Sequence, residues 1–147
     1  MKRIALAAVL AVSTTPAFAA GHAATVGDAA AGEQQFNRQC VACHVVQDDS
    51  GAILAGRNAK TGPNLYGVAG RTLGSVDGFR YGDELVSAGE AGFVWTEDNF
   101  AAFVQDPTSW LRETLENRRA RSKMAYRVRD EGQAYDIYAY LATFGAQ

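Results

Sequence analysis

The five residues Cys40-Val41-Ala42-Cys43-His44 constrain the fold of this chain more than any other stretch. Two cysteines separated by two residues and followed at once by histidine form C-x-x-C-H, the attachment sequence of a c-type haem. The two thiols would form thioether bonds to the haem, and the His44 imidazole would lie within reach of the iron. We therefore expect one haem c, bound covalently through Cys40 and Cys43.

Other uses of a closely spaced cysteine pair fit the chain less well. A disulfide between Cys40 and Cys43 would close a very short loop and would stabilise little. A thiol-redox pair of the thioredoxin kind expects a βαβ context. A structural zinc site needs four ligands, and the chain has no second cysteine pair. Haem attachment is the interpretation that the adjacent His44 favours.

The first 19 residues have the three parts of a secretory signal peptide. A basic start is followed by an apolar run over residues 4–12 and by the A-x-A site Ala17-Phe18-Ala19. The run is too short for a membrane anchor, because a spanning helix needs roughly 20 residues. We expect residues 1–19 to be cleaved after Ala19 and the remainder to reach the periplasm.

The remainder is expected to form a short arm and one domain. Residues 20–27 are small and show no period, which predicts a flexible N-terminal arm. Residues 28–147 are enough for one domain with one core. Without Lys2 and Arg3 the chain holds 12 basic and 16 acidic residues, a net charge of about −4. Nothing after the signal peptide is apolar enough to span a membrane, so we expect a soluble domain.

Three segments start at capping residues of helices, and a fourth has apolar residues at helical spacing. They begin at Asp28, Thr96, Asp106 and Asp130, and the first ends near Gln39 and the last near Phe144. Residues 45–80 contain seven glycines and show no period, which predicts irregular loops that a large buried cofactor could hold in place. Since no segment alternates convincingly, the expected fold class is all-α.

Met124 is the strongest candidate for a second iron ligand opposite His44. Once Met1 leaves with the signal peptide, Met124 is the only methionine, and the only other histidine, His22, lies in the expected arm. A lone methionine usually fills a core, but a haem that needs a sixth ligand changes that expectation. His/Met ligation raises the reduction potential and saturates the iron.

Ordered motifs across the whole exported domain resemble those of bacterial class I cytochromes c, in particular the cytochrome c2 type. They are Gly32, Phe36, Cys40–His44, Lys60–Tyr66, Gly70-Arg71, Gly78–Tyr81, Trp95, Asp106-Pro107, Lys123-Met124 and Tyr140-Leu141. The resemblance implies a cytochrome c fold, with helices and long loops around one haem. It also implies an electron carrier rather than an enzyme, which shuttles electrons from a cytochrome bc1-type complex to a photosynthetic reaction centre or a terminal oxidase.

The resemblance also implies roles for single residues. His44 and Met124 match the axial ligands, and Pro63 matches the proline whose carbonyl accepts the proximal imidazole N–H and so orients the ring. Gly32 and Tyr140 match the crossing of the first and last helices. A further set matches the donors to a buried haem propionate, with core packing as the alternative for its two aromatic members: Arg71, Tyr81 and Trp95.

Phe103 departs from this pattern, because many relatives have a tyrosine there whose hydroxyl contacts the methionine sulfur. Our hypothesis is that its absence alters the reduction potential and the firmness of the Met124–iron bond. Two other functions stay open on the sequence alone. A peroxidase-like or thiol-redox enzyme would need an open iron or free thiols, and a ligand-sensing haem protein would need Met124 to dissociate readily.

Basic residues gather around Met124, with seven of the twelve in the exported chain falling within residues 112–129. A charge run is usually a solvated face. If Met124 binds the iron, however, a positive field would surround one side of the haem and orient the chain on an acidic partner. We expect transient docking of a monomer on membrane redox complexes, and no nucleic-acid binding by a net acidic exported chain. The expected docking residues are Arg119, Arg121, Lys123 and Arg127.

Overall fold

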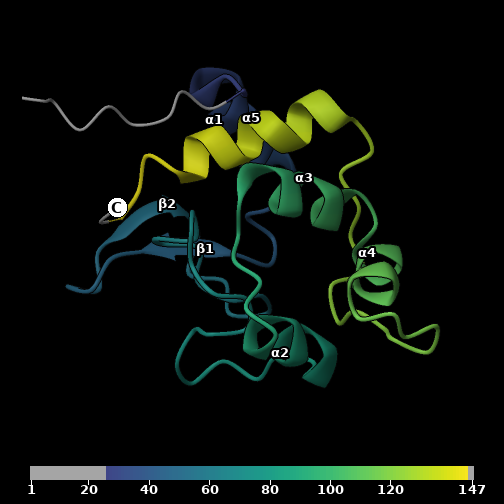
Figure 1. The fold of residues 1–147 in the computed structure, drawn as a ribbon. Coiled ribbons are helices and arrows are strands. Elements are labelled where there is room, and N and C mark those ends of the chain that lie inside the picture. The colour runs from purple at the N-terminus through teal and green to yellow at the C-terminus, as the bar shows by residue number, and fades with distance from the viewer. Residues whose placement is uncertain (1–25, 146–147) are drawn as a thin grey trace, which may run out of the picture.

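The computed structural model describes residues 26–145. Within this range the elements are, in order, α1 (Ala29–Gln39), β1 (Val45–Gln47), β2 (Ile53–Gly56), α2 (Asp83–Glu90), α3 (Glu97–Gln105), α4 (Pro107–Thr114) and α5 (Glu131–Leu141). α1 and α5 lie across one another at one end, the two strands lie to one side, and α2 is at the opposite end (Figure 1). The expected signal peptide, His22 and most of the expected arm lie outside the described residues.

Four helices begin at capping side chains, three of which the sequence predicted as caps and the fourth of which, Asp130, the structure adds. The side chains of Asp28, Thr96, Asp106 and Asp130 accept hydrogen bonds from backbone N–H groups in the first turns of α1, α3, α4 and α5. Pro107 occupies the first turn of α4, where a missing N–H leaves no hydrogen bond unmade. The four expected helices are therefore confirmed, although α5 ends at Leu141 rather than near Phe144.

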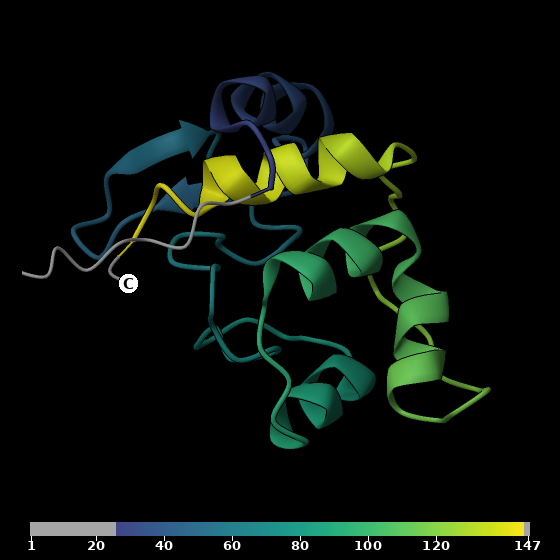
Figure 2. The same ribbon diagram turned by 45° about the horizontal axis from the view of Figure 1, so that its top comes forward.

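The crossing of α1 and α5 depends on a glycine. A Cβ at Gly32 would overlap the Asp136 carbonyl oxygen and would lie 2.8 Å from the Tyr140 Cβ. Phe36 is fully buried at this crossing, and its ring centroid lies 5.6 Å from that of Tyr140. The close approach of the two helices is visible from two directions (Figures 1 and 2). It fixes the end of α1, from which the C-x-x-C-H motif follows.

An aromatic cluster fills the space between α3, α4 and the segment before them. The Trp95 ring centroid lies 5.0 Å from Phe103 and 6.3 Å from Trp110, and Phe103 lies 5.7 Å from Trp110. Aromatic pairs at such spacings stabilise a core beyond their burial alone. Tyr138 of α5 closes the cluster from the other side, because its hydroxyl donates to the Trp95 carbonyl at 3.0 Å.

Residues 45–56 form a β-hairpin, whereas the sequence predicted an irregular loop. β1 and β2 pair antiparallel, with an irregularity between Val46 and Gln47. The Asp48 carboxylate sets the turn by accepting from the N–H groups of Ser50 and Ala52, at 2.9 Å each. Strands this short, one of them bulged, cannot show an alternating pattern, so the periodicity gave no signal. The helical class is confirmed, with this small sheet as an addition.

α2 is a second element that the sequence analysis did not predict. Its N-cap is Gly82, which offers no side-chain hydrogen bond, so the usual start signal is missing. The helix is fixed by tertiary contact instead, because a Cβ at Gly89 would overlap the Leu73 carbonyl oxygen. Asp83 and Glu84 in the first turn are the one sequence feature that suits a helix start.

Candidate functional site

The end of α1 presents the C-x-x-C-H motif as a tight turn. Cys40 is the C-cap of α1, and its carbonyl accepts hydrogen bonds from the N–H groups of Cys43 at 3.1 Å and His44 at 2.9 Å. The two cysteines form no disulfide; Cys40 is half-buried and Cys43 is exposed. The turn therefore brings both thiols and the imidazole to one place at the edge of the core.

The environment of Cys40 does not suit thiol–disulfide exchange. Burial raises the pKa of the Cys40 thiol to about 12, and the neighbouring Cys43 thiol adds to the increase. The thiolate is the form that attacks disulfides, and a high pKa keeps it scarce near neutral pH. The thiol-redox alternative therefore loses support.

His44 is held on two sides by the segment that follows the hairpin. Its Nδ1 lies 3.0 Å from the Pro63 carbonyl oxygen, and because a carbonyl can only accept, Nδ1 carries the proton and Nε2 keeps its lone pair. A Cβ at Gly62 would overlap the ring, so the imidazole packs directly on that backbone. Burial lowers the His44 pKa, although the bond to Pro63 opposes this, and the neutral ring is the form that binds metals.

Asn64 connects this segment to the hairpin, and neither Asn64 nor Gly62 was singled out from the sequence. The Asn64 side chain accepts from the N–H groups of Gln47 at 3.0 Å and Tyr66 at 3.1 Å, and it donates to the Gln47 carbonyl at 2.7 Å. The Gly62-Pro63-Asn64 run is itself a turn signal. Nothing in its spacing, however, indicates which strand it will contact.

Arg71 has one buried nitrogen without a partner. Its Nη1 donates to the Tyr66 carbonyl at 2.7 Å and its Nη2 to the Asn64 carbonyl at 3.1 Å. The Nε is the one buried side-chain nitrogen or oxygen in residues 26–145 that lacks a hydrogen bond. A buried donor left unsatisfied is costly, so this atom suits an acceptor that the chain itself does not supply.

Tyr81 and Trp95 lie close to Arg71. Burial raises the Tyr81 pKa, while the nearby Arg71 guanidinium acts in the opposite direction. The backbone N–H of Trp95 donates to the backbone carbonyl of Arg71 at 2.9 Å, and the Trp95 side chain is buried in the aromatic cluster. The structure thus places Tyr81 within electrostatic reach of the Arg71 guanidinium and the Trp95 backbone beside that of Arg71. Phe103, in place of a tyrosine, packs against Trp95 and has no hydroxyl to offer.

Met124 lies in an irregular stretch between α4 and α5, residues 115–130, which we call the Met124 segment. Met124 is half-buried and packs against the core. Its N–H donates to the Ser122 hydroxyl at 3.1 Å, and the Ser122 N–H donates to the Thr108 hydroxyl of α4 at 3.3 Å. The Lys123 ammonium donates to the carbonyl of Tyr81 at 2.7 Å. The segment that carries Met124 is thereby joined to the one that carries Tyr81.

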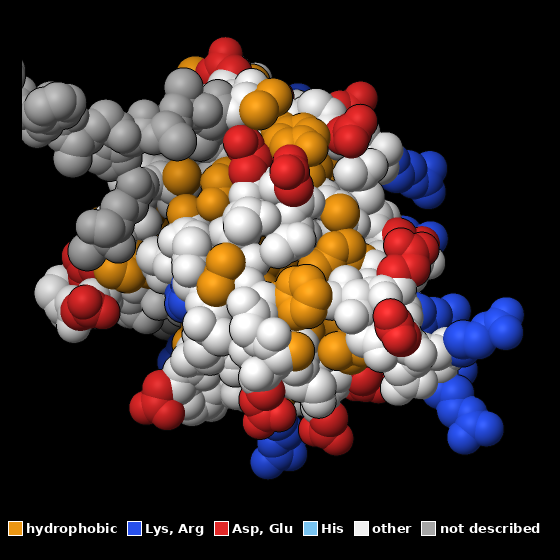
Figure 3. Space-filling view, viewed as in Figure 1, with side chains coloured by type: hydrophobic (Ala, Val, Ile, Leu, Met, Phe, Trp, Pro, Cys, Tyr) orange, Lys and Arg blue, Asp and Glu red, His pale blue; other side chains and the backbone are white. Residues whose placement is uncertain are grey.

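The four expected docking residues differ in how free their charged groups are. The Lys123 ammonium is bound to backbone carbonyls, and the Arg127 guanidinium pairs with Asp106 at 3.1 Å. Arg119 and Arg121 are exposed and form no ion pair within the described chain. Lys and Arg side chains gather along the edge that covers α4 and the loop after it (Figure 3).

This set of residues fits a covalently attached haem. It contains two unpaired thiols one turn apart, an imidazole with a free Nε2, a thioether on a separate segment and a buried guanidinium nitrogen that needs an acceptor. No group of three or more His, Cys, Asp or Glu residues in the described part could hold a metal ion by itself. Within the same residues, no helix is both long and apolar enough to cross a bilayer.

Several known proteins are similar to this chain in sequence and in structure. No family model matches. Cytochrome c2 of Rhodovulum adriaticum is 60% identical over 119 residues, which cover 81% of this chain and 94% of the relative. Cytochrome c2 of Cereibacter sphaeroides is 48% identical over 138 residues, or 93% and 91% of the two chains. The crystal structure of cytochrome c2 from Rhodobacter sphaeroides superposes with a TM-score of 0.79 at 47% identity, over 82% of this chain and 98% of the other.

Proposed function

Since the chain belongs to the cytochrome c2 family, we propose that it carries electrons in the periplasm, from a cytochrome bc1-type complex to a photosynthetic reaction centre or a terminal oxidase. It has the cytochrome c fold, it is an electron carrier and not an enzyme, and its haem c is attached through Cys40 and Cys43. The periplasmic location rests on the signal peptide expected at residues 1–19. Residues 20–27 would then be the arm and residues 28–147 the haem domain.

We propose that His44 and Met124 would be the two protein ligands of the haem iron. The observation that carries this proposal is the 3.0 Å contact of His44 Nδ1 with the Pro63 carbonyl, which leaves Nε2 as the free donor atom. When bound, the haem supplies an iron that takes up and releases one electron between Fe(III) and Fe(II). Pro63 and Gly62 keep the imidazole in one orientation, and the Met124 segment brings a neutral thioether from a different part of the chain. Two such ligands suit outer-sphere electron transfer and leave no position for peroxide or dioxygen.

Arg71, Tyr81 and Trp95 are proposed to surround a buried haem propionate. The unpartnered Nε of Arg71 supports this, because a carboxylate removed from water needs charged or hydrogen-bonding partners. Tyr81 lies within electrostatic reach of Arg71, and its hydroxyl contacts the Val76 backbone. Trp95 contributes at least its ring, which forms part of the aromatic cluster.

Docking is proposed to be transient and driven by charge, with the chain acting as a monomer and without nucleic acid. Arg119 and Arg121 are the residues best placed for long-range attraction, because their guanidinium groups form no ion pair within the described chain. The Glu84 carboxylate lies beside Arg121, where it accepts from the backbone N–H at 3.2 Å. Lys123 and Arg127 add charge at the same edge but are held by internal bonds. A positive field beside the proposed ligand Met124 would raise the encounter rate with an acidic surface, and salt would screen it.

The experiment is electron transfer from the reduced holoprotein to isolated reaction centres, and from isolated bc1-type complex to the oxidised holoprotein, over a series of salt concentrations. The double variant Arg119→Glu and Arg121→Glu should slow the bimolecular rate at low salt by about tenfold or more and flatten its salt dependence. Arg57→Glu, an exposed reversal directly after the hairpin, is the matched control and should change the rate little. Equal rates for the double variant and the control would remove the docking role.

A further inference from the structure

Side chains, rather than a regular element, fasten the Met124 segment on both sides of Met124. On one side, Lys123 reaches the carbonyls of Arg80 and Tyr81 at 3.2 and 2.7 Å. On the other side, the Tyr126 hydroxyl donates to Gln39 Oε1 at 3.0 Å. The second of these contacts joins the segment to α1, because Gln39 is the last residue of that helix and the covalent neighbour of Cys40.

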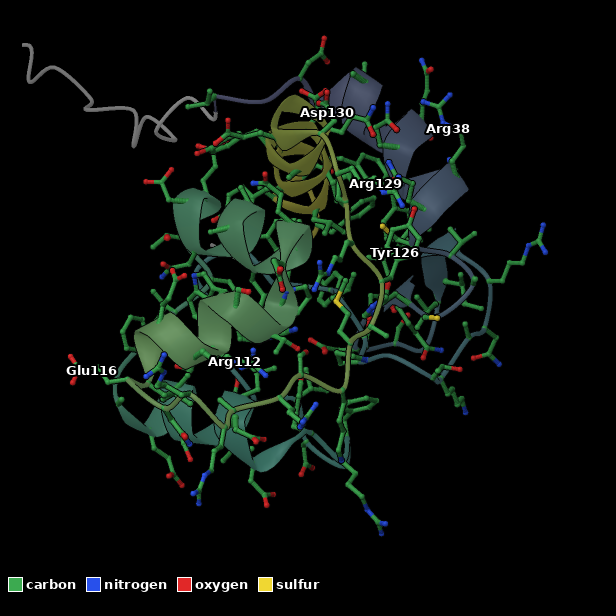
Figure 4. All side chains as sticks on the ribbon, turned by 90° about the vertical axis from the view of Figure 1, so that its right-hand side faces the viewer. Arg38, Arg112, Glu116, Tyr126, Arg129 and Asp130 are labelled. Atoms are coloured by element: carbon green, nitrogen blue, oxygen red, sulfur yellow. The ribbon has the colours of Figure 1, made fainter. Side chains whose placement is uncertain are left out.

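Gln39 is itself held in a fixed orientation. Its Nε2 donates to Gln35 Oε1 and to Gln133 Oε1, at 2.9 Å each, so its Oε1 is the atom left to accept from Tyr126. Gln133 lies in the first turn of α5, which means that the Tyr126 hydroxyl contacts a network shared by α1 and α5. Figure 4 shows Tyr126 on the Met124 segment, on the side where α1 lies.

Tyr126 is not a core residue, and burial does not explain its position. About half of its surface, 49%, is exposed, and it borders an open pocket of about 550 Å³ that Gln39 and Gln133 also line. A side chain so placed is free to turn into solvent unless a directed contact holds it. The hydroxyl contact with Gln39 is such a contact, and it spans 87 positions of the sequence.

We propose that the Tyr126–Gln39 hydrogen bond is a strap that positions Met124 and sets how readily an outside ligand displaces it from the iron. This inference rests on the proposed ligand role of Met124. The strap exists only while the Met124 segment lies against α1, so it opposes any displacement of Met124 that moves the segment away from that helix. An interaction made in one of two states shifts their balance by its full free energy. Tyr126 is therefore a positioning residue.

The test is an imidazole titration of the ferric holoprotein, followed by the loss of the near-infrared sulfur-to-iron band. Tyr126→Phe keeps the ring and removes the hydroxyl, and it should raise the apparent imidazole affinity about two- to tenfold, the range of one net side-chain hydrogen bond. Tyr135→Phe is the matched control. Its hydroxyl donates to Asp98 at 3.1 Å, between α5 and α3, so its loss should leave the affinity unchanged.

A double-mutant cycle with Gln39→Ala tests whether Tyr126 acts through its bond to Gln39 or through a general increase in the mobility of the Met124 segment. Gln39→Ala should raise the imidazole affinity as Tyr126→Phe does, and the double variant should show no further rise from losing the same bond twice. Equal affinities for Tyr126→Phe and Tyr135→Phe, or fully additive effects in the double variant, would overturn the strap. If the unmodified ferric protein shows no sulfur-to-iron band, the ligand role of Met124 itself fails, and this result is distinct from the other two.

Discussion

The two segments that carry the proposed iron ligands are held in different ways. Around His44 the direct contacts are made by backbone: the turn at Cys40, the Pro63 carbonyl and the bare Cα of Gly62, with the Asn64 side chain holding the Pro63 segment on β1. Around Met124 they are made largely by side chains: the Ser122 and Thr108 hydroxyls close by, and Lys123 and Tyr126, which reach out to other segments. The first kind of contact is built into the fold, whereas the second can be broken while the fold stays intact.

This difference predicts two kinds of variant. Changes beside His44 should lower the free energy of unfolding of the whole domain, because they disturb packed backbone that has no alternative arrangement. Changes beside Met124 should leave the domain folded and alter mainly how firmly Met124 is held. Guanidinium unfolding reports the first effect, and imidazole affinity of the ferric protein reports the second.

Gly62→Ala should have the largest effect. The added Cβ would lie 2.6 Å from His44 Nδ1 and 2.7 Å from Nε2, closer than any real contact, so the ring or the Pro63 segment must shift. Overpacking of this kind costs about 1–3 kcal/mol, and guanidinium unfolding of the holoprotein should show at least that loss. Gly132→Ala, in the first turn of α5, is the control and should change stability little, because its helix propensity offsets a Cβ contact of 3.3 Å with the Asp130 carboxylate. A Gly62→Ala protein as stable as this control would contradict the account of the His44 side.

Asn64→Ala should come next. It removes two hydrogen bonds that join the Pro63 segment to Gln47 of β1, and a third within the segment, from the Tyr66 N–H. The Gln47 N–H and carbonyl lose these partners. We expect a loss of about 1–3 kcal/mol in the free energy of unfolding. The sulfur-to-iron band and the imidazole affinity should stay unchanged. A large rise in imidazole affinity would show that the two sides are not independent.

Lys123→Ala should have a smaller effect than Asn64→Ala, and it should change the imidazole affinity rather than the free energy of unfolding. It breaks the contacts with the carbonyls of Arg80 and Tyr81, which are exposed and therefore weakened by water. The imidazole affinity should rise about two- to tenfold, with little change in guanidinium unfolding. Lys60→Ala removes an exposed lysine near His44 and serves as the comparison. If Lys123→Ala unfolds at lower guanidinium concentration and its imidazole affinity is unchanged, then Lys123 stabilises the fold and does not help to retain Met124.

Asp106→Asn should have the smallest effect, and one that depends on pH. The Ser109 backbone N–H, with the Arg127 charge as a further contribution, lowers the Asp106 pKa below its usual 3.8. A carboxyl with a lowered pKa in the folded state stabilises the fold above the unfolded value, and this stabilisation is lost as the pH falls through the folded value. Thermal unfolding should therefore show Asp106→Asn slightly less stable than the parent at pH 7. The difference in stability between Asp106→Asn and the parent should shrink below about pH 4. A difference that does not change with pH would mean that it comes from helix capping and not from the carboxylate charge.

Much of this could be predicted from the sequence because the signals were local. The starts of α1, α3, α4 and α5 follow from caps within a few residues, and C-x-x-C-H marks its own site. The hairpin and α2 could not be predicted. They depend on the turn at Asp48 and on the Gly89–Leu73 contact, and neither produces a periodic pattern of apolar residues in the sequence. The partners of Lys123 and Tyr126 were also hidden, since each lies more than 40 positions away.

The central claim is that His44 and Met124 both bind the iron, and near-infrared absorption of the ferric holoprotein tests it most directly. The account predicts a weak sulfur-to-iron band in the unmodified protein and its complete loss in Met124→Leu, a variant of similar volume that lacks the sulfur. Phe103→Tyr, which restores the hydroxyl found in many relatives, should keep the band and change the imidazole concentration needed to abolish it. A parent protein without the band, or a Met124→Leu variant that retains it, would contradict the account.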